Sequence, residues 1–218
     1  MIVIFGNEAS LAVHGCVLRL FCRLQTLKDS RIRNIHPAHA SVLIDFDPLQ
    51  VQHAELMALL ENLIPQDTGE VAGAGREIRI PVCYDRQLGP DLDDVAAHCK
   101  TPVEEVIQLH ASADYLVSFL GFSPGFGYLA GLPAKLAIPR LLTPRKLVRA
   151  GSVGIAGMQT GIYSVDSPGG WRIVGRTPLS MFDPEADPPT LLQYGDRVRF
   201  DPIDFREFES RLEIRRRR

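Results

Sequence analysis

Residues 143–178 carry the residue types best suited to binding a small polar ligand. Guanidinium groups bind carboxylates and phosphates, while amide, hydroxyl and backbone groups fix a ligand's orientation. Glycine beside such side chains lets the backbone approach a ligand or a partner closely. The candidate residues in this segment are Arg145, Ser152, Gln159, Thr160, Tyr163, Gly169, Gly170 and the single tryptophan, Trp171. We predict that they form part of a site for an anionic or amide ligand, or for a protein partner.

A second candidate stretch, "FLGFSPGFGYLAGLP" at residues 119–133, places four aromatic residues among four glycines and two prolines. Glycine and proline both disfavour a helix, so we expect loops or strands that bend. The rings either wall a cleft or serve as core residues on an irregular loop, and the residues alone leave both interpretations open. The candidates here are Phe122, Pro124, Phe126 and Tyr128, to which we add His110 and Arg140.

The sequence contains no complete catalytic constellation. Ser152 lies in "AGSVG", which lacks the G-x-S-x-G pattern of a nucleophile elbow. There is no Walker lysine loop and no G-x-G-x-x-G after a strand, so no motif supports ATP binding by this chain alone. None of the six histidines shows HExxH spacing, and His110 is a helix-end charge, a satisfied core histidine or a site residue. We predict no metal site, and a site that a partner subunit completes.

Composition is typical of a soluble globular protein, with 45% hydrophobic residues, 23% charged residues and a net charge of −2. This charge argues against a nucleic-acid partner or an acidic membrane surface. No apolar run approaches the roughly 18 residues of a membrane span, and the N-terminus lacks the basic start of a signal peptide. The four cysteines form no CxxC pair, which favours reduced thiols and a cytoplasmic protein.

Residues 1–80 alternate strand and helix patterns. Apolar residues at helical spacing predict helices at residues 12–27 and around 56–64. Short β-branched runs predict strands at "IVIF", "RIRNI", "SVLIDF" and "REIRIPV", the last beginning at residue 76. The order β-α-β-β-α-β is that of a ferredoxin-like arrangement. The polar, glycine-rich residues 65–75 are predicted to be a linker.

After residue 82 the pattern changes to two short helices followed by many short strands. Asp91 is the expected N-cap of the first helix, and Thr101 with Glu104 forms a capping box for the second. Beyond residue 115, short apolar runs alternate with glycine and proline, which is typical of a sandwich or a closed barrel. The two halves together predict an α+β fold.

Several long motifs occur in the order of a known family: "IPVCYD…GPDLDDVAAHCK", "VIQLHASADYLVSFLGFSPGFGYLAGLP", "IPRLLTPRKLVRAGSVGIAGMQTGIYSVDSPGGWRIVGRTPLSMFDP" and "YGDRVRFDPI". By these motifs the chain resembles the KipI/PxpB family, also called allophanate hydrolase subunit 1. The resemblance is dense over residues 78–203 and looser before them, where it rests mainly on "NIHPAHASVLIDFDP". It implies an N-terminal α/β domain followed by a cyclophilin-like β-barrel. The predicted domains are a ferredoxin-like α/β domain at residues 1–77 and a cyclophilin-like β-barrel domain at residues 78–218.

The resemblance implies one of three functions. In one branch the family member is the PxpB subunit of an ATP-dependent 5-oxoprolinase, which works with a PxpC (KipA-like) subunit and with PxpA to open 5-oxoproline to glutamate. In another branch KipI inhibits a sensor histidine kinase, and in a third the homologous segment belongs to urea carboxylase. We expect the first function, with the chain inactive alone and ATP bound in the assembled complex, not necessarily by this chain. The implied partners are PxpC-like and PxpA-like subunits or, alternatively, a histidine kinase.

Overall fold

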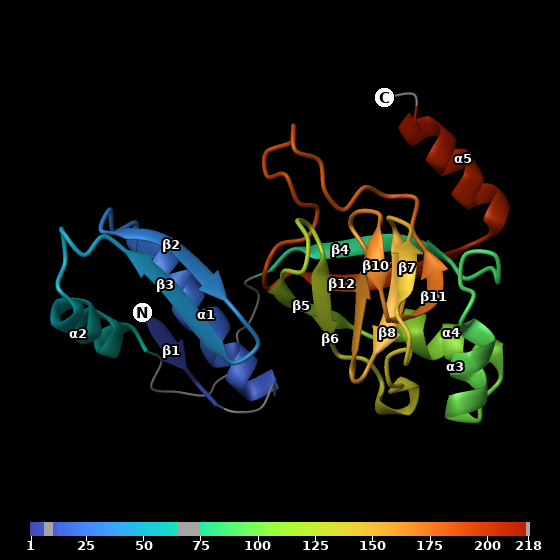
Figure 1. The fold of residues 1–218 in the computed structure, drawn as a ribbon, viewed down its shortest axis with the longest axis horizontal. Helices are drawn as coiled ribbons and strands as arrows, with labels where there is room; N and C mark the ends of the chain where they lie inside the picture. The colour runs from blue at the N-terminus through green and yellow to red at the C-terminus, as the bar shows by residue number, and fades with distance from the viewer. Residues whose placement is uncertain (7–10, 65–74, 217–218) are drawn as a thin grey trace. The chain divides into compact units, whose positions relative to one another are not determined.

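The computed structural model describes residues 1–6, 11–64 and 75–216. The chain divides into two compact units, Met1–Ala74 and Gly75–Arg218. Figure 1 labels the helices and strands of both units, which differ in architecture: the first is a small open sheet with helices, and the second is built on a closed barrel.

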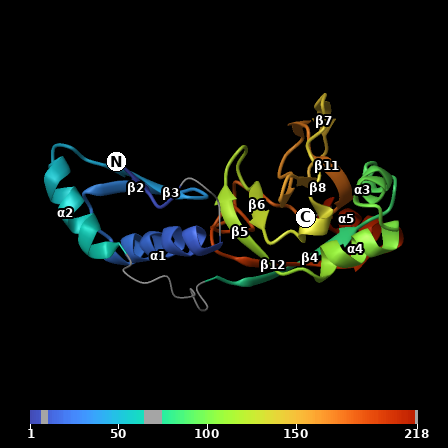
Figure 2. The ribbon, with the colours of Figure 1, turned by 90° about the horizontal axis from the view of Figure 1, so that it is seen from below.

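The first unit contains a three-stranded antiparallel sheet in the order β1-β3-β2 (Figures 1 and 2). α1 packs against β2 and β3, and α2 packs against α1. Apolar residues at helical spacing on α1 and α2 meet the buried face of β3, as the sequence pattern predicts. The elements are β1 (Ile2–Ile4), α1 (Leu11–Leu27), β2 (Ile32–Pro37), β3 (Ser41–Phe46) and α2 (His53–Leu63). The core is formed by Val17, Leu20, Leu24, Val42, Ile44, Val51, Leu56 and Leu60.

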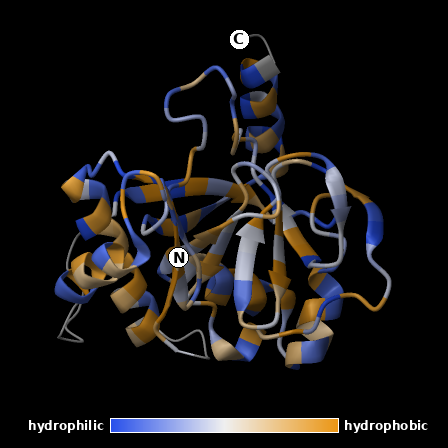
Figure 3. Cartoon of the chain, turned by 60° about the vertical axis from the view of Figure 1, so that its left-hand side comes forward, coloured by the Kyte–Doolittle hydropathy of each residue, from blue (hydrophilic) through white to orange (hydrophobic). Residues whose placement is uncertain are grey.

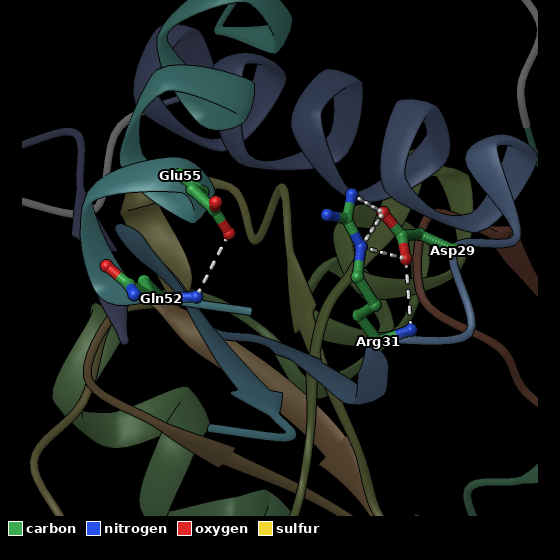
Figure 4. A network of polar contacts seen from close by, with 4 residues as sticks. All are labelled: Asp29, Arg31, Gln52 and Glu55. Atoms are coloured by element: carbon green, nitrogen blue, oxygen red, sulfur yellow. Dashed lines mark hydrogen bonds and ion pairs between the residues drawn. The ribbon is translucent and has the colours of Figure 1, made fainter. Parts of the chain in front are cut away.

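Short polar contacts hold two of the connections in this unit (Figure 4). In the turn before β2, Arg31 Nη2 lies 2.6 Å from Asp29 Oδ2, and the Arg31 backbone N–H donates to Asp29 Oδ1 at 2.9 Å. These hydrogen bonds lower the pKa of Asp29 to about 2. At the start of α2, the backbone N–H of Gln52 donates to Glu55 Oε2 at 3.2 Å and so satisfies a donor at the helix start.

The strand expected at residues 76–82 forms as β4 (Glu77–Cys83), but it belongs to the second unit. It pairs in parallel with β12 (Arg197–Ile203), and the described residues of the first unit form a sheet of three strands only. The ferredoxin-like arrangement is therefore not confirmed. A hydrophobic pattern predicts that a strand forms but carries no information about its pairing partner. The predicted linker at residues 65–75 lies, apart from Gly75, outside the described residues.

The second unit is built on a closed barrel of seven strands in the order β11-β4-β12-β5-β6-β9-β8. This confirms a barrel, one of the two architectures that the short strands predict. Buried and exposed residues alternate at the start of β12, where Val198 and Phe200 are buried and Arg199 is exposed. Hydrophobic side chains fill the interior. The other barrel strands are β5 (Tyr115–Leu120), β6 (Gly127–Ala130), β8 (Ser152–Ala156), β9 (Gln159–Ile162) and β11 (Arg172–Arg176).

The remaining elements of this unit lie outside the barrel wall. β7 (Arg145–Val148) and β10 (Ser167–Gly169) form a separate two-stranded antiparallel sheet, drawn in front of the barrel in Figure 1. α3 (Leu92–Cys99) packs against β11, and α4 (Val103–Ser112) packs against β12. The short 3-10 helix η1 (Ala134–Leu136) and the largely hydrophilic helix α5 (Phe205–Arg216, Figure 3) complete the described residues.

Both predicted helices form, but neither begins with the predicted side-chain cap. Asp91 occupies the N-cap position of α3 without making a capping hydrogen bond. The N-cap of α4 is Pro102 rather than Thr101, so the expected capping box is wrong. The reason is that Thr101 still belongs to the end of α3: Lys100 adopts φ 52°, and the Thr101 backbone N–H donates to the carbonyl of Ala96 at 3.0 Å.

Candidate functional site

A second hydrophobic cluster lies on the outer face of the barrel, separate from the interior core. Neighbouring residues of one strand divide between the two clusters: Leu129 belongs to the interior and Tyr128 to the outer cluster, and Val174 and Ile173 divide in the same way. Successive side chains of a strand point to opposite faces, so this alternation places the second cluster outside the wall. The buried members of this outer cluster are Phe126, Val148, Ala156, Tyr163, Trp171 and Ile173, with Tyr128 partly buried against them.

Phe126 is the centre of the outer cluster. Its ring centroid lies 4.8 Å from that of Tyr128, 5.3 Å from that of Tyr163 and 5.6 Å from that of Trp171. The contacts with Tyr163 and Trp171 are edge-to-face, a geometry that contributes about 0.5–1.5 kcal/mol per pair beyond the area buried. Of the two interpretations of the aromatic stretch, packing as a core is the one that Phe126 adopts, against Tyr163 and Trp171 from the other candidate segment.

Two glycines explain how so many rings pack against one sheet. A Cβ atom on Gly161 would lie 3.1 Å from Trp171 Cζ3 and 3.2 Å from Phe126 Cζ, closer than most real Cβ contacts. A Cβ atom on Gly169, which is a predicted site residue, would overlap the hydroxyl of Tyr163. The absence of side chains at these positions therefore makes room for the rings.

Phe122 is the exposed ring of the aromatic stretch, with 61% of the residue accessible to solvent. It sits between β5 and β6 with φ 69°, a left-handed conformation that is unfavourable for a bulky residue. Contacts on both sides hold the loop: the Phe126 backbone N–H donates to the carbonyl of Ser123 at 3.0 Å, and the hydroxyls of Ser123 and Ser164 lie 3.0 Å apart. The Phe122 ring meets that of Phe126 edge-on at 5.4 Å. A strained residue held in this way is a candidate for a functional contact.

A guanidinium group lies next to these rings. Arg140 is exposed, and its Cζ atom lies 5.9 Å from the ring centroid of Trp171. Burial raises the pKa of Tyr128, an effect that the nearby charge of Arg140 opposes. We define the aromatic face as the accessible residues of this region: Phe122, Pro124, Tyr128 and Arg140.

His110 and Thr160 lie inside the barrel, not on the aromatic face. Thr160 Oγ1 donates its proton to the carbonyl of Gly154 at 2.9 Å. The same oxygen therefore accepts a hydrogen bond from His110 Nε2–H at 2.9 Å. With the proton on Nε2, His110 Nδ1 accepts a hydrogen bond from the Tyr84 hydroxyl at 2.8 Å. The His110 ring stacks on Phe200 with centroids 4.8 Å apart. Burial lowers the pKa of His110 to about 3, so the ring is neutral at physiological pH. The geometry supports the satisfied core histidine among the three interpretations of His110.

Arg145 and Ser152 line a separate pocket of about 200 Å³. Arg145 Nη2 lies 2.6 Å from Oδ1 of Asp91, whose other oxygen accepts the backbone N–H of Ile173 at 2.6 Å. Asp91, predicted as a helix N-cap, is thus the buried ion-pair partner of Arg145, the residue predicted to bind an anion. Two further arginines line the pocket, Arg149 and Arg176, which the candidate set omits. Their proximity depends on how β7 lies over β8 and β11, which sequence spacing does not give.

The other predicted residues are dispersed. Gln159 begins β9 and is half-buried, opposite Ala156 of β8. The carbonyl of Gly170 accepts the backbone N–H of Leu141 at 2.7 Å, which ties the segment before β11 to the segment before β7. A larger pocket of about 730 Å³ lies between α5 and residues 178–184, and none of the predicted residues lines it.

Two absences concern the described residues only. Within residues 1–6, 11–64 and 75–216, no group of three or more His, Cys, Asp or Glu side chains is placed to hold a metal ion. Over the same ranges, every helix is too short or too polar to span a membrane.

Known proteins share both the sequence and the fold. Residues 1–192 match the family described as "Carboxyltransferase domain, subdomain C and D". A protein of Bacillus subtilis (strain 168), named as the B subunit of 5-oxoprolinase, is 36% identical over 220 residues, which cover 96% of this chain and 92% of that protein. A protein of the same name from Escherichia coli O157:H7 is 56% identical over 127 residues, 58% of each chain.

The solved structure of TTHA0988 superposes on 94% of this chain with a TM-score of 0.83 and 36% sequence identity. The superposed region spans 40% of the TTHA0988 chain, so that protein contains a large additional part. Sequence and structure agree with the resemblance that the motifs indicate. The chain therefore belongs to the family of carboxyltransferase domains, subdomains C and D, and with it to the KipI/PxpB family.

Proposed function

We propose that this chain is the PxpB component of an ATP-dependent 5-oxoprolinase, which converts 5-oxoproline to glutamate. The observation that carries the proposal is the 36% identity to a protein named as the B subunit of 5-oxoprolinase, over 92% of that protein's length. Such coverage includes both units of this chain. Because the reaction consumes ATP, we place the complex in the cytoplasm.

We further propose that the chain is inactive alone and works with a PxpC-like and a PxpA-like subunit. Ser152 makes no side-chain hydrogen bond to a base among the described residues, and His110 is buried and neutral. Neither residue has the surroundings of an activated nucleophile or a general base. ATP binding and bond cleavage therefore require groups from partner subunits, with ATP bound in the assembled complex.

The aromatic face is our candidate for the contact with a partner. Phe122 projects from a loop that hydrogen bonds hold, and the buried ring of Phe126 supports it. Protein interfaces concentrate their binding energy in aromatic and arginine side chains that a rigid base supports. Phe122, Tyr128 and Arg140 supply these residue types at one place on the barrel.

Reconstitution tests the proposal. The purified chain is combined with PxpC-like and PxpA-like subunits, ATP and 5-oxoproline, and glutamate release is measured. We expect release only when all three proteins and ATP are present. Full activity without this chain would refute the proposal. Binding to a sensor histidine kinase, with no glutamate release in the complete mixture, would instead support the KipI-type inhibitor.

A further inference from the structure

The 200 Å³ pocket beside the outer cluster is lined by three arginines from two segments of the second unit. Arg145 begins β7, Arg149 follows the end of β7, and Arg176 ends β11. None of the described residues that line the pocket is acidic. Three guanidinium groups and two aspartates, Asp91 and Asp166, leave a net positive charge at the pocket, which favours an anion.

Carboxylates outside the lining hold two of these arginines in place. Asp91, 3% exposed, binds Arg145 Nη2 at 2.6 Å, and Asp166 binds Arg149 Nη1 at 2.7 Å. Arg176 is oriented by its own contact, because its Nε–H donates to the carbonyl of Ala150 at 2.9 Å. The three guanidinium groups are therefore positioned before any ligand arrives, which lowers the entropy cost of binding.

One donor on the pocket residues remains unmatched. Arg145 Nη1 is buried and has no hydrogen-bond partner among the described residues. Ser152, a residue only 5% exposed, lines the same pocket and adds a hydroxyl group to it. An unmatched buried donor costs free energy, and an oxygen of an anion is the acceptor that the Arg145 guanidinium lacks here.

The volume limits the size of the ligand. Pockets for drug-sized molecules occupy roughly 300–1,000 Å³, so about 200 Å³ suits a smaller species. We propose that this pocket binds a small oxyanion, a phosphate or the carboxylate of a small acid, through Arg145, Arg149 and Arg176, with Ser152 as a further donor. The inference does not depend on the proposed function, because the pocket is formed by this chain alone. In a 5-oxoprolinase the two sources would be the phosphate released from ATP and the carboxylate of 5-oxoproline.

The test uses the full chain without partners. Inorganic phosphate and 5-oxoproline are titrated separately by isothermal titration calorimetry, with ionic strength held constant by chloride, and phosphate binding is followed in parallel by ³¹P NMR. We expect saturable binding of one probe. Arg149→Gln and Arg176→Gln should each weaken it about tenfold or more, because each removes a charged donor. Ser152→Ala should weaken it by a smaller factor.

Arg79→Gln is the matched control, since Arg79 forms an exposed ion pair with Asp201 at 2.6 Å on the same barrel but outside the pocket. It should bind like the wild type. Saturable binding of phosphate would show that the pocket binds phosphate. Saturable binding of 5-oxoproline alone would show that the pocket binds the carboxylate. Absence of saturable binding by both probes, or equal weakening in Arg79→Gln, overturns the proposal. Circular dichroism melting confirms that each variant folds, and the outcome is independent of the reconstitution experiment.

Discussion

The interior of the barrel and its outer cluster both contain aromatic and polar residues, but they differ in exposure to solvent. Inside, Tyr84, His110 and Thr160 are buried, and each polar group pairs with the next. Outside, Phe126 and Trp171 are buried as deeply, but the cluster continues into an exposed, strained Phe122. A closed barrel filled by side chains leaves no room for a ligand. Chemistry on this unit must therefore occur on the outside of the wall, even though the interior holds the only histidine among the predicted site residues.

The largest expected difference in the free energy of unfolding is between the variants Phe126→Ala and Phe122→Ala. Removing the buried ring of Phe126 should lower the free energy of unfolding by about 3–5 kcal/mol, because it leaves a cavity among three other rings. Phe122→Ala removes a mainly exposed ring and should cost less than about 1 kcal/mol. Urea denaturation followed by Trp171 fluorescence measures both. Equal destabilisation would show that Phe122 is part of the core.

Thr160→Val tests whether the interior chain of hydrogen bonds is structural. The change keeps the shape but leaves His110 Nε2–H buried without an acceptor, at a cost of about 1–3 kcal/mol. Gln159→Ala, on the adjacent and half-exposed position of β9, should change stability by less than about 0.5 kcal/mol. In the reconstituted reaction the kcat and KM of both variants should match the wild type. A kcat loss in Thr160→Val with unchanged stability would place Thr160 in the site.

The pH dependence of stability separates the buried histidine from an accessible one. The folded pKa of His110, about 3, lies below its ordinary value of 6.5, so the unfolded state binds a proton that the folded state does not. The free energy of unfolding should therefore fall as pH drops from about 6.5 towards 3, by up to about 1.4 kcal/mol per pH unit from this group. Trp171 fluorescence reports on the barrel unit, and His110→Gln should flatten the profile. An NMR titration of the His110 ring near pH 6.5 would contradict this account.

Phe122→Gly should change stability least and partner binding most. Glycine adopts φ 69° without strain, so the relief of about 1 kcal/mol offsets the loss of ring contacts. If Phe122 anchors a partner, affinity for the PxpC-like subunit should fall by tenfold or more, as measured by biolayer interferometry. Leu142→Gly removes another exposed hydrophobic side chain outside the aromatic face and serves as the control. Unchanged affinity in Phe122→Gly would remove the aromatic face from the interface.

The sequence predicts much of the fold because periodicity and turn residues act locally. α1, β3 and the strands of a barrel follow from apolar spacing and from glycine and proline between runs. The partner of β4 is set by contacts about 120 residues away, and no local pattern encodes it. The same limit applies to the site. The sequence predicts Arg145 as a residue that binds an anion, but only the tertiary structure brings Arg149 and Arg176 to the same pocket, and only it separates Thr160 from Tyr163.

The parallel pairing of β4 with β12 also determines when this unit can fold during synthesis. Glu77 lies opposite Arg197, and Cys83 lies opposite Ile203, so β12, which completes the wall, is the last barrel strand to be made within the described residues. Closing so long a loop is entropically costly, and pairings of high sequence separation form slowly. In the barrel β12 lies between β4 and β5, so until β12 leaves the ribosome one edge of each of these strands is unpaired. Unpaired strand edges can pair with strands of other chains. We therefore expect this unit to be most exposed to aggregation during synthesis just before β12 is translated.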